Sequence, residues 1–283
     1  MPTPAVEKSK AASVLVVDDD AMMRELLVRV LKDHATLETC ESGADALARL
    51  SSKAYDVVLL DIGLPDISGL EVLRQKAPVA SNSRFLIITA DDTPDTVIEA
   101  VRGQAYGYLR KPFTPDELRM AFEECLAATA DPAIEVVSAR PDWFELSLPC
   151  TRSAANRIDN FMQQLELELA PDVRDTVAQA FRELLMNAVE WGGGFDPSRR
   201  VRVACLRTAR ILFYRIADPG PGFHFKELTH AAVSHPDDPI AHMSVREEKG
   251  IRPGGLGLVM VKAFADELLY NEKQNEVVFI KYL

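Results

Sequence analysis

Apolar and polar positions along the first 128 residues follow two alternating patterns. Short continuous apolar runs are typical of strands covered on both faces of a parallel sheet, and segments with apolar residues at helical spacing separate them. This alternation predicts an α/β fold built on a doubly wound parallel sheet. The predicted strands are Val14–Val17, Thr36–Cys40, Val57–Leu60, Phe85–Thr89 and Tyr106–Leu109, and the predicted helices begin near Met22, Ser42, Leu70, Pro94 and Pro115.

Several predicted strands end in residues suited to phosphoryl chemistry. Asp18 and Asp19 follow the first strand, and Asp61 follows the third. Thr89 and Lys111 stand at the ends of two others. Each residue alone indicates a solvated surface group, but the carboxyl ends of parallel strands meet at one edge of the sheet, so we expect them to lie together. Clustered carboxylates suit Mg²⁺, while a lysine and a threonine supply donors to a phosphoryl group.

The remainder of the chain shows a different order of elements. A strand over Trp143–Leu148 precedes a helix that begins at Thr151 or Ser153 and runs to about Leu169, and a second helix begins near Pro171. The glycines at 192–194 are expected to stop that helix. Further strands are expected at Arg200–Leu206, Ile211–Ala217, Leu268–Tyr270 and Val277–Ile280, with a helix from Gly254 to about Phe264.

The two halves meet in a segment that indicates a linker. Thr114, Pro115 and Glu117 form a capping box with proline at the first position of the last helix of the first half. The following stretch, Ala127–Pro141, is rich in alanine and contains two prolines. We therefore expect a flexible tail over residues 1–13, one domain over 14–128, a linker over 129–142 and a second domain over 143–283.

Three motifs of the second half carry candidate chemistry. Glu183 and Asn187 lie four residues apart and share one helix face, where an exposed polar edge is the simpler interpretation. An aspartate opens the segment Asp218–Gly222, which reads Asp-Pro-Gly-Pro-Gly; it could accept a hydrogen bond from an exocyclic amine, although an isolated turn has the same pattern. Glycines at 254, 255 and 257 precede a helix and would free N–H groups for phosphate. The long segment between the Asp218 motif and these glycines is a candidate lid. The spacing of its histidines fits no familiar metal-binding motif.

Composition excludes several classes of protein. The formal net charge of −11 argues against a general nucleic-acid binder, and no basic recognition helix indicates direct DNA binding. The four cysteines show no CxxC spacing, so reduced core thiols are expected. No apolar run approaches the length of a membrane span, which predicts a cytoplasmic protein without a membrane partner.

The first half resembles the receiver domains of two-component response regulators, on the segments VLVVDDD, LLDIGLPDISGLEVL, IITAD and YLRKPF. The resemblance implies that Asp61 accepts a phosphoryl group from a histidine kinase or phosphotransfer protein. It implies Mg²⁺ ligands at Asp18, Asp19, Asp61 and the Gly63 carbonyl. It further implies phosphoryl contacts from Thr89 and Lys111, an aromatic switch at Tyr108, and a cis peptide bond at Lys111–Pro112.

The second half resembles the GHKL (Bergerat) ATPases, and within them the anti-sigma-factor serine kinases, on the order of ExxxN, DxGxG and GGLG. The implied fold is an α+β sandwich that binds Mg²⁺ and ATP. Asn187 would be the Mg²⁺ ligand and Glu183 the base or water-positioning carboxylate. Asp218 would read adenine, with its pocket shaped by Gly220 and Gly222, while Gly255 and Gly257 would cradle phosphates. The chain departs from the family in having Trp191 where histidine is frequent, and prolines at both variable positions of DxGxG.

Together the two resemblances predict a phosphorylation-controlled serine/threonine kinase of the partner-switching type. Its partners would be an anti-sigma-factor antagonist, a sigma factor or both, and a homodimer is compatible with it. A non-catalytic module that sequesters a partner when ATP is bound is an alternative. A histidine-kinase-like ATPase is another alternative. Residues 115–169, where a phosphorylatable histidine would be expected, contain no histidine, so such an ATPase would act on a separate phosphotransfer protein. The sign of control by Asp61 is open.

Overall fold

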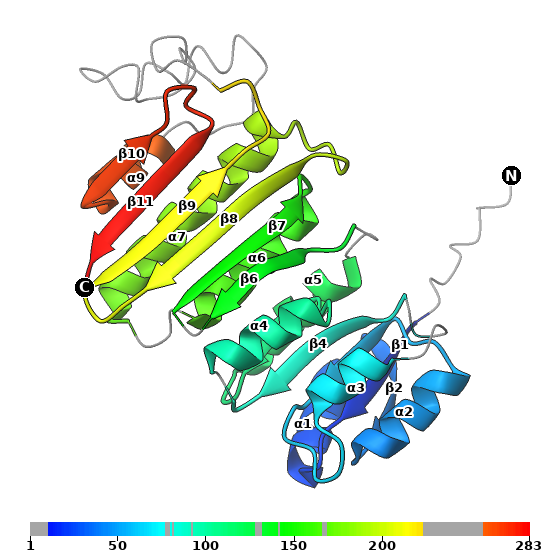
Figure 1. The fold of residues 1–283 in the computed structure, drawn as a ribbon. Coiled ribbons are helices and arrows are strands. Elements are labelled where there is room, and N and C mark those ends of the chain that lie inside the picture. Colours follow the sequence, from blue (N-terminus) through cyan, green and yellow to red (C-terminus); the bar gives the residue numbers. More distant parts are fainter. Residues whose placement is uncertain are drawn as a thin grey trace, which may run out of the picture. The chain divides into compact units, whose positions relative to one another are not determined.

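The structure is a computed structural model that describes residues 11–76, 80, 82–91, 93–127, 132–140, 142–165, 169–222 and 257–283. The chain divides into two units, Met1–Ala130 and Asp131–Leu283, and each is described by itself (Figure 1). Among the described residues, no helix combines the length and apolar character that a membrane-spanning segment requires.

The first unit contains a parallel sheet with the strand order β2-β1-β3-β4-β5. Its register places Val17 beside both Cys40 and Leu60, so the ends of β1, β2 and β3 coincide. The order reverses at β1, and sites in such sheets collect at the carboxyl ends near that reversal. The strands are β1 (Ala12–Val17), β2 (Ala35–Cys40), β3 (Val57–Leu60), β4 (Arg84–Thr89) and β5 (Gly107–Arg110).

Five helices cover the two faces of this sheet, which confirms the predicted doubly wound architecture. On one face, Leu27 and Phe122 from α1 and α5 join a core with Val16 and Leu59 of the sheet. Contacts of α3 with α2 and with α4 form the other layer. The helices are α1 (Ala21–Leu31), α2 (Gly43–Ser52), α3 (Gly69–Gln75), α4 (Pro94–Arg102) and α5 (Pro115–Ala127).

Side-chain caps fix where these helices begin. The predicted capping box is present: the Glu117 N–H donates to Oγ1 of Thr114 at 3.2 Å, and the Thr114 N–H donates to Oε2 of Glu117 at 2.6 Å. Ser42 accepts from the Asp45 N–H at the start of α2, as expected. Asp66 also accepts from the N–H groups of Gly43 and Ala44, which ties the loop after β3 to that helix.

The second unit is an antiparallel sheet with helices on one face, in agreement with the predicted α+β class. The strand order is β10-β11-β9-β8-β7-β6. Figure 1 shows α6, α7 and α9 behind the sheet, and Phe181 of α7 packs on Tyr214 of β9 with ring centroids 4.9 Å apart. The elements are β6 (Glu135–Arg140), β7 (Trp143–Pro149), α6 (Arg152–Leu165), α7 (Pro171–Asn187), β8 (Arg200–Arg207), β9 (Ile211–Ala217), α9 (Gly257–Phe264), β10 (Glu267–Tyr270) and β11 (Glu276–Tyr282).

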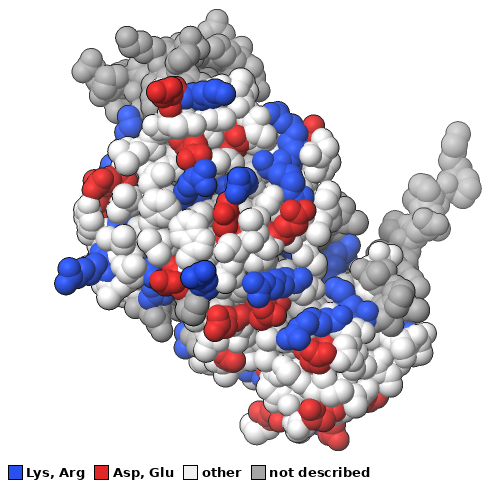
Figure 2. Space-filling view, in the orientation of Figure 1, with Lys and Arg blue, Asp and Glu red and all other residues white. Residues whose placement is uncertain are grey.

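The other face of this sheet carries mixed charges. Arg215 pairs with Glu276 at 2.8 Å, and Arg202 pairs with Glu145 across neighbouring strands. Figure 2 shows Lys and Arg interspersed with Asp and Glu over this side. The described part of this face therefore offers no continuous basic stripe of the kind that a nucleic-acid backbone requires.

One sequence-based expectation for the second unit is wrong. Residues 135–140, assigned to the linker, form β6, which pairs with β7 along the edge of the sheet. The register slips between Val136 and Ser138, and this irregularity breaks the alternation that identifies a strand. The predicted helix stop at the glycines 192–194 is confirmed: α7 continues as a π-helix over Ala188–Gly192, and Gly193 caps its end.

Candidate functional site

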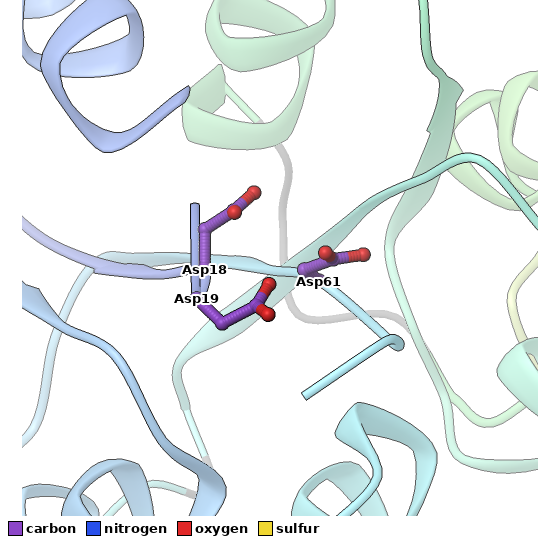
Figure 3. A group of neighbouring side chains, drawn as sticks. All are labelled: Asp18, Asp19 and Asp61. Atoms are coloured by element: carbon purple, nitrogen blue, oxygen red, sulfur yellow. The ribbon is translucent and has the colours of Figure 1, made fainter. Parts of the chain in front are cut away.

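Three carboxylates gather at the ends of β1 and β3 in the first unit. One oxygen from each of Asp18, Asp19 and Asp61 lies within 4.8 Å of the others (Figure 3). Asp18 is 1% exposed and Asp61 is 7% exposed, whereas Asp19 faces solvent. The sequence prediction that these side chains converge is confirmed. The parallel register accounts for it, since Val17 and Leu60 are paired and the next residue of each strand turns toward the same edge.

Lys111 reaches this cluster from the end of β5. Its Nζ donates to Oδ2 of Asp18 at 2.7 Å and to Oδ2 of Asp61 at 3.0 Å. Its backbone N–H donates to the Thr89 carbonyl at 2.8 Å, and the Lys111–Pro112 peptide bond is cis, as the sequence resemblance implied. Thus one ammonium bridges two carboxylates that would otherwise repel.

Burial and charge act against each other in this cluster. Burial raises the pKa of Asp18, while the hydrogen bond and the charge of Lys111 oppose that rise. Burial lowers the pKa of Lys111, but its contacts with Asp18 and Asp61 outweigh burial, so the pKa of Lys111 lies above its ordinary value. Lys111 is therefore held as a cation between the carboxylates.

Backbone groups hold the carboxylates in place. The Ile62 N–H donates to Oδ1 of Asp61 at 2.8 Å, and the Asp20 N–H donates to Oδ1 of Asp18 at 2.9 Å. Arg24 donates to the carbonyls of Asp18 and Asp19, which fixes the chain after β1. The set of carboxylate oxygens, with one member open to solvent, fits a hard divalent cation that retains some of its water, such as Mg²⁺.

The other predicted residues of this pocket lie close along the chain or the sheet. The backbone of Gly63 lies beside Asp61, because a Cβ at residue 63 would be 3.8 Å from Oδ2. Thr89 is 2% exposed at the end of β4, and its Oγ1 accepts from the Asp91 N–H at 3.2 Å. Tyr108 is 1% exposed, and its hydroxyl donates to the Asp91 carbonyl. The phosphoryl contacts of Thr89, the switch role of Tyr108 and the Gly63 carbonyl ligand stay predictions.

In the second unit, Glu183 and Gly257 bring α7 and α9 together. A Cβ atom at Gly257, the first residue of α9, would lie 2.0 Å from Oε2 of Glu183. Asn187 follows one turn later on α7, partly buried. The predicted carboxylate therefore lies against the N-terminus of the helix that was expected to bind phosphates. Gly255 and the lid candidate, including its histidines, lie outside the described residues.

Asp218 follows β9 and lies against the π-helix at the end of α7. A Cβ at Gly192 would be 2.2 Å from Cγ of Asp218, and a Cβ at Gly220 would be 2.7 Å from Oδ1. Oδ1 accepts from the Gly220 N–H at 2.7 Å, while Oδ2 accepts no hydrogen bond from any described residue. Burial raises the pKa of Asp218, with the Gly220 hydrogen bond opposing it.

The adenine contact that the resemblance implies for Asp218 stays a prediction. Oδ2 of Asp218 is an acceptor to which no described residue donates, and Gly192 and Gly220 lie so close to the carboxylate that an added Cβ would overlap it. Gly192 was missed as a site residue, because its packing on Asp218 depends on the π-helix. Gly222, the last glycine of the motif, has φ +84° and packs on the backbone of Lys273 rather than on Asp218.

Comparison with known proteins assigns each unit to a family. Residues 14–123 match the response regulator receiver domain, and residues 149–281 match the histidine kinase-like ATPase domain. The transcriptional regulatory protein ZraR of Salmonella typhimurium is 32% identical over 148 residues, which cover 51% of this chain and 34% of ZraR. The response regulator MprA of Mycolicibacterium vanbaalenii is 35% identical over 141 residues, which cover 49% of this chain and 61% of MprA.

Among solved structures, the chemotaxis response regulator CheY4 of Vibrio cholerae is 28% identical and has a TM-score of 0.39, with 41% of this chain and 100% of that chain covered. The chain spans between a third and about three fifths of the length of the two curated relatives. It consists of a response regulator receiver domain, residues 14–123, followed by a histidine kinase-like ATPase domain, residues 149–281.

Proposed function

We propose that this protein is a phosphorylation-controlled response regulator whose output domain binds Mg–ATP and transfers the γ-phosphoryl group to a serine or threonine of a protein partner. The partner class suggested by the sequence resemblance is an anti-sigma-factor antagonist, within a switch that also controls a sigma factor. The observation that carries the proposal is that one chain contains both the cluster of Lys111 with Asp18, Asp19 and Asp61, and a second unit that holds Asp218 and the contact between Glu183 and the start of α9.

In the receiver domain, Asp61 is the proposed phosphoacceptor. A carboxylate oxygen of Asp61 forms the new bond to phosphorus as the bond from phosphorus to the donor's imidazole nitrogen breaks, and the histidine leaves. Lys111, already 3.0 Å from Oδ2, would move to an oxygen of the incoming group. Asp18 and Asp19 would hold Mg²⁺, which neutralises charge on the transferring phosphoryl group.

In the ATPase domain, the proposed roles come from the sequence resemblance. Asp218 would orient the adenine by accepting from its exocyclic amine. Asn187 would take part in holding Mg²⁺, and Glu183 would accept the proton of the attacking hydroxyl or orient it. Bound Mg²⁺ supplies charge neutralisation, and phosphoryl transfer depends mainly on positioning and electrostatics.

The test is a titration of Mg–ATP onto the full chain, with and without beryllofluoride as a mimic of phosphorylated Asp61. Both tryptophans, Trp143 and Trp191, belong to the ATPase unit, so intrinsic fluorescence reports on that unit alone. We expect binding in both conditions with an affinity that differs between them. Asn187→Ala should weaken binding about 10-fold or more, the size expected for a lost metal ligand or its support.

Controls separate the two sites. Asp61→Asn should abolish the response to beryllofluoride and leave Mg–ATP binding intact. If Asp61→Ala still accepts a phosphoryl group from a small-molecule donor, the phosphoacceptor assignment is wrong. If Asn187→Ala binds Mg–ATP like the parent, the metal assignment in the ATPase domain is wrong. Binding of ATP without any transfer to protein or water would favour the non-catalytic binding module.

A further inference from the structure

The Asp218 loop is held from behind by the hairpin that joins β10 and β11. The Asp218 N–H donates to the Asn275 carbonyl at 2.9 Å. In return, Nδ2 of Asn275 donates to the Gly220 carbonyl at 3.1 Å and to the Asp218 carbonyl at 3.4 Å. Asn275 thus contacts both Asp218, whose Oδ2 accepts from no described residue, and Gly220, whose N–H donates to Oδ1 of Asp218.

The amide of Asn275 is itself fixed in orientation. Its Oδ1 accepts from Nδ2 of Asn271 at 2.8 Å, and its backbone N–H donates to Oδ1 of Asn271 at 3.1 Å. Because Oδ1 is committed to Asn271, Nδ2 must face the Asp218 loop. The Gln274 residue beside it has φ +56°, which directs the chain back into β11.

A second contact comes from the same hairpin. Gly222 has φ +84°, and a Cβ there would be 1.6 Å from the Lys273 carbonyl oxygen. The loop from Asp218 to Gly222 is therefore anchored to the hairpin at both ends. Prolines at 219 and 221 lack N–H groups, so the loop has fewer backbone donors with which to stabilise itself.

We propose that Asn275 is a positioning residue for purine recognition, which acts by fixing the Asp218 carboxylate so that Oδ2 meets the 6-amino group of adenine. This proposal rests on the proposed function, since it concerns the same nucleotide site. Asn275 touches no nucleotide atom in this scheme. Its effect is on selectivity, because a hydrogen bond from the amine to a fixed, partly buried carboxylate discriminates more strongly than one to a mobile group.

The experiment compares two nucleotides on the full chain in the presence of Mg²⁺. ATP and purine riboside 5′-triphosphate differ only in the 6-amino group. We expect the parent to prefer ATP by about 10- to 100-fold, the range for a hydrogen bond to a charged group. Asn275→Ala and Asn275→Asp should reduce this preference to about 3-fold or less, with ATP losing more affinity than the analogue.

The Asp266→Asn variant is the matched control. Asp266 joins the open end of the same hairpin, where it accepts from Nζ of Lys281 at 3.0 Å and from the Tyr282 N–H. The Asp266→Asn variant should have a looser hairpin and retain the parent's preference for ATP. The charge that Asn275→Asp adds weakens both nucleotides alike, so the ratio of affinities is the readout. Asn275→Ala gives the same ratio without added charge and serves if the aspartate variant does not fold.

Each outcome has one meaning. If the parent binds both triphosphates equally well, Asp218 does not read the amine and the positioning role is overturned, although nucleotide binding stands. If the Asn275 variants lose affinity for both nucleotides by the same factor, Asn275 is only structural and the proposal is wrong. If the parent binds neither triphosphate, the proposed function fails, and the assignment of Asn275 fails with it.

Discussion

The first residue of α9, Gly257, packs directly on the carboxylate of Glu183, because a Cβ atom at residue 257 would lie 2.0 Å from Oε2. The nearest atom is the far end of a flexible side chain, so an added methyl group would displace the carboxylate at small cost in stability. Glycine at residue 257 therefore affects the position of the Glu183 carboxylate more than the stability of the helix.

We expect Gly257→Ala to lower the single-turnover rate of ATP hydrolysis about 100-fold, the lower end of what a positioned base contributes. Mg–ATP affinity should stay within about 3-fold of the parent, and the free energy of unfolding within about 1 kcal/mol. Glu183→Gln should reproduce the loss, and combining the two variants should add little further. Undiminished hydrolysis by Gly257→Ala would contradict the role given to Glu183.

Lys111→Met should destabilise the receiver unit by about 3–5 kcal/mol in the absence of divalent cations, since it leaves two buried carboxylates without their partner. Mg²⁺ should raise the melting temperature of this variant more than that of the parent, because the cation replaces the lost charge. Calorimetry with and without Mg²⁺ measures both effects. Lys32→Met, at an exposed position on the first unit, is the control. An equal response of variant and parent to Mg²⁺ would argue against a cation site at the three carboxylates.

Gly192→Ala should weaken Mg–ATP binding about 10- to 100-fold. The added Cβ would be 2.2 Å from Cγ of Asp218, and that short side chain cannot move away without breaking its bond to Gly220. Gly194→Ala is the control: residue 194 has φ +67°, and among the described residues none beyond its chain neighbours lies within 4 Å of an added Cβ, so it acquires backbone strain away from Asp218. Fluorescence titration compares the two. Equal weakening by both changes would mean that strain, not contact with Asp218, is responsible.

We expect Asp159 to make the stability of the ATPase unit depend on pH. Nε of Arg182 donates to Oδ2 of this buried carboxyl at 2.7 Å, while Oδ1 has no partner among the described residues. Burial raises the pKa of Asp159 above 3.8, with Arg182 opposing the rise. A raised pKa contributes stability that is present below 3.8 and is lost as pH rises through the folded-state value. The melting temperature of Asp159→Asn relative to the parent should therefore increase from pH 4 upward.

For Asp266→Asn we expect the stability relative to the parent to change with pH in the opposite direction. The hydrogen bond from the Tyr282 N–H lowers the pKa of Asp266, so its contribution is present above pH 3.8 and is lost as pH falls. The melting temperature of Asp266→Asn should therefore fall further below that of the parent as pH rises. Melting curves followed by tryptophan fluorescence at several pH values test both variants within one unit. Parallel trends for the two would show that neither carboxyl controls the pH response.

The elements that could be predicted from the sequence are those whose signal is local. The capping box at Thr114 and Glu117 and the buried run Val57–Leu60 each depend on neighbouring residues, and both are present as expected. The convergence of Asp18, Asp19 and Asp61 followed from topology, since parallel strands present their ends at one edge.

What could not be predicted depends on contacts between distant segments. β6 is an edge strand whose irregular pairing with β7 hides the two-residue period. Gly192 becomes a site residue only because the π-helix brings it against Asp218, and the turn residue Asn275 is polar like the residues of any hairpin. Nothing in their neighbourhoods in the sequence separates them from ordinary glycines and asparagines.

The anchoring of Asp218 by Asn275 also sets an order of assembly during translation. All five strands of the receiver sheet lie between residues 12 and 110, so that unit has its full set of partners early. β9 receives its second neighbour, β11, only when residues 276–282 have emerged, and the clamp on Asp218 spans 57 residues. Since domains fold as they leave the ribosome, we expect a nascent chain to complete the cluster of Asp18, Asp19, Asp61 and Lys111 before the Asp218 loop. Premature termination just before the last hairpin would therefore leave a receiver unit with all its strands beside an ATPase unit whose Asp218 loop has no clamp.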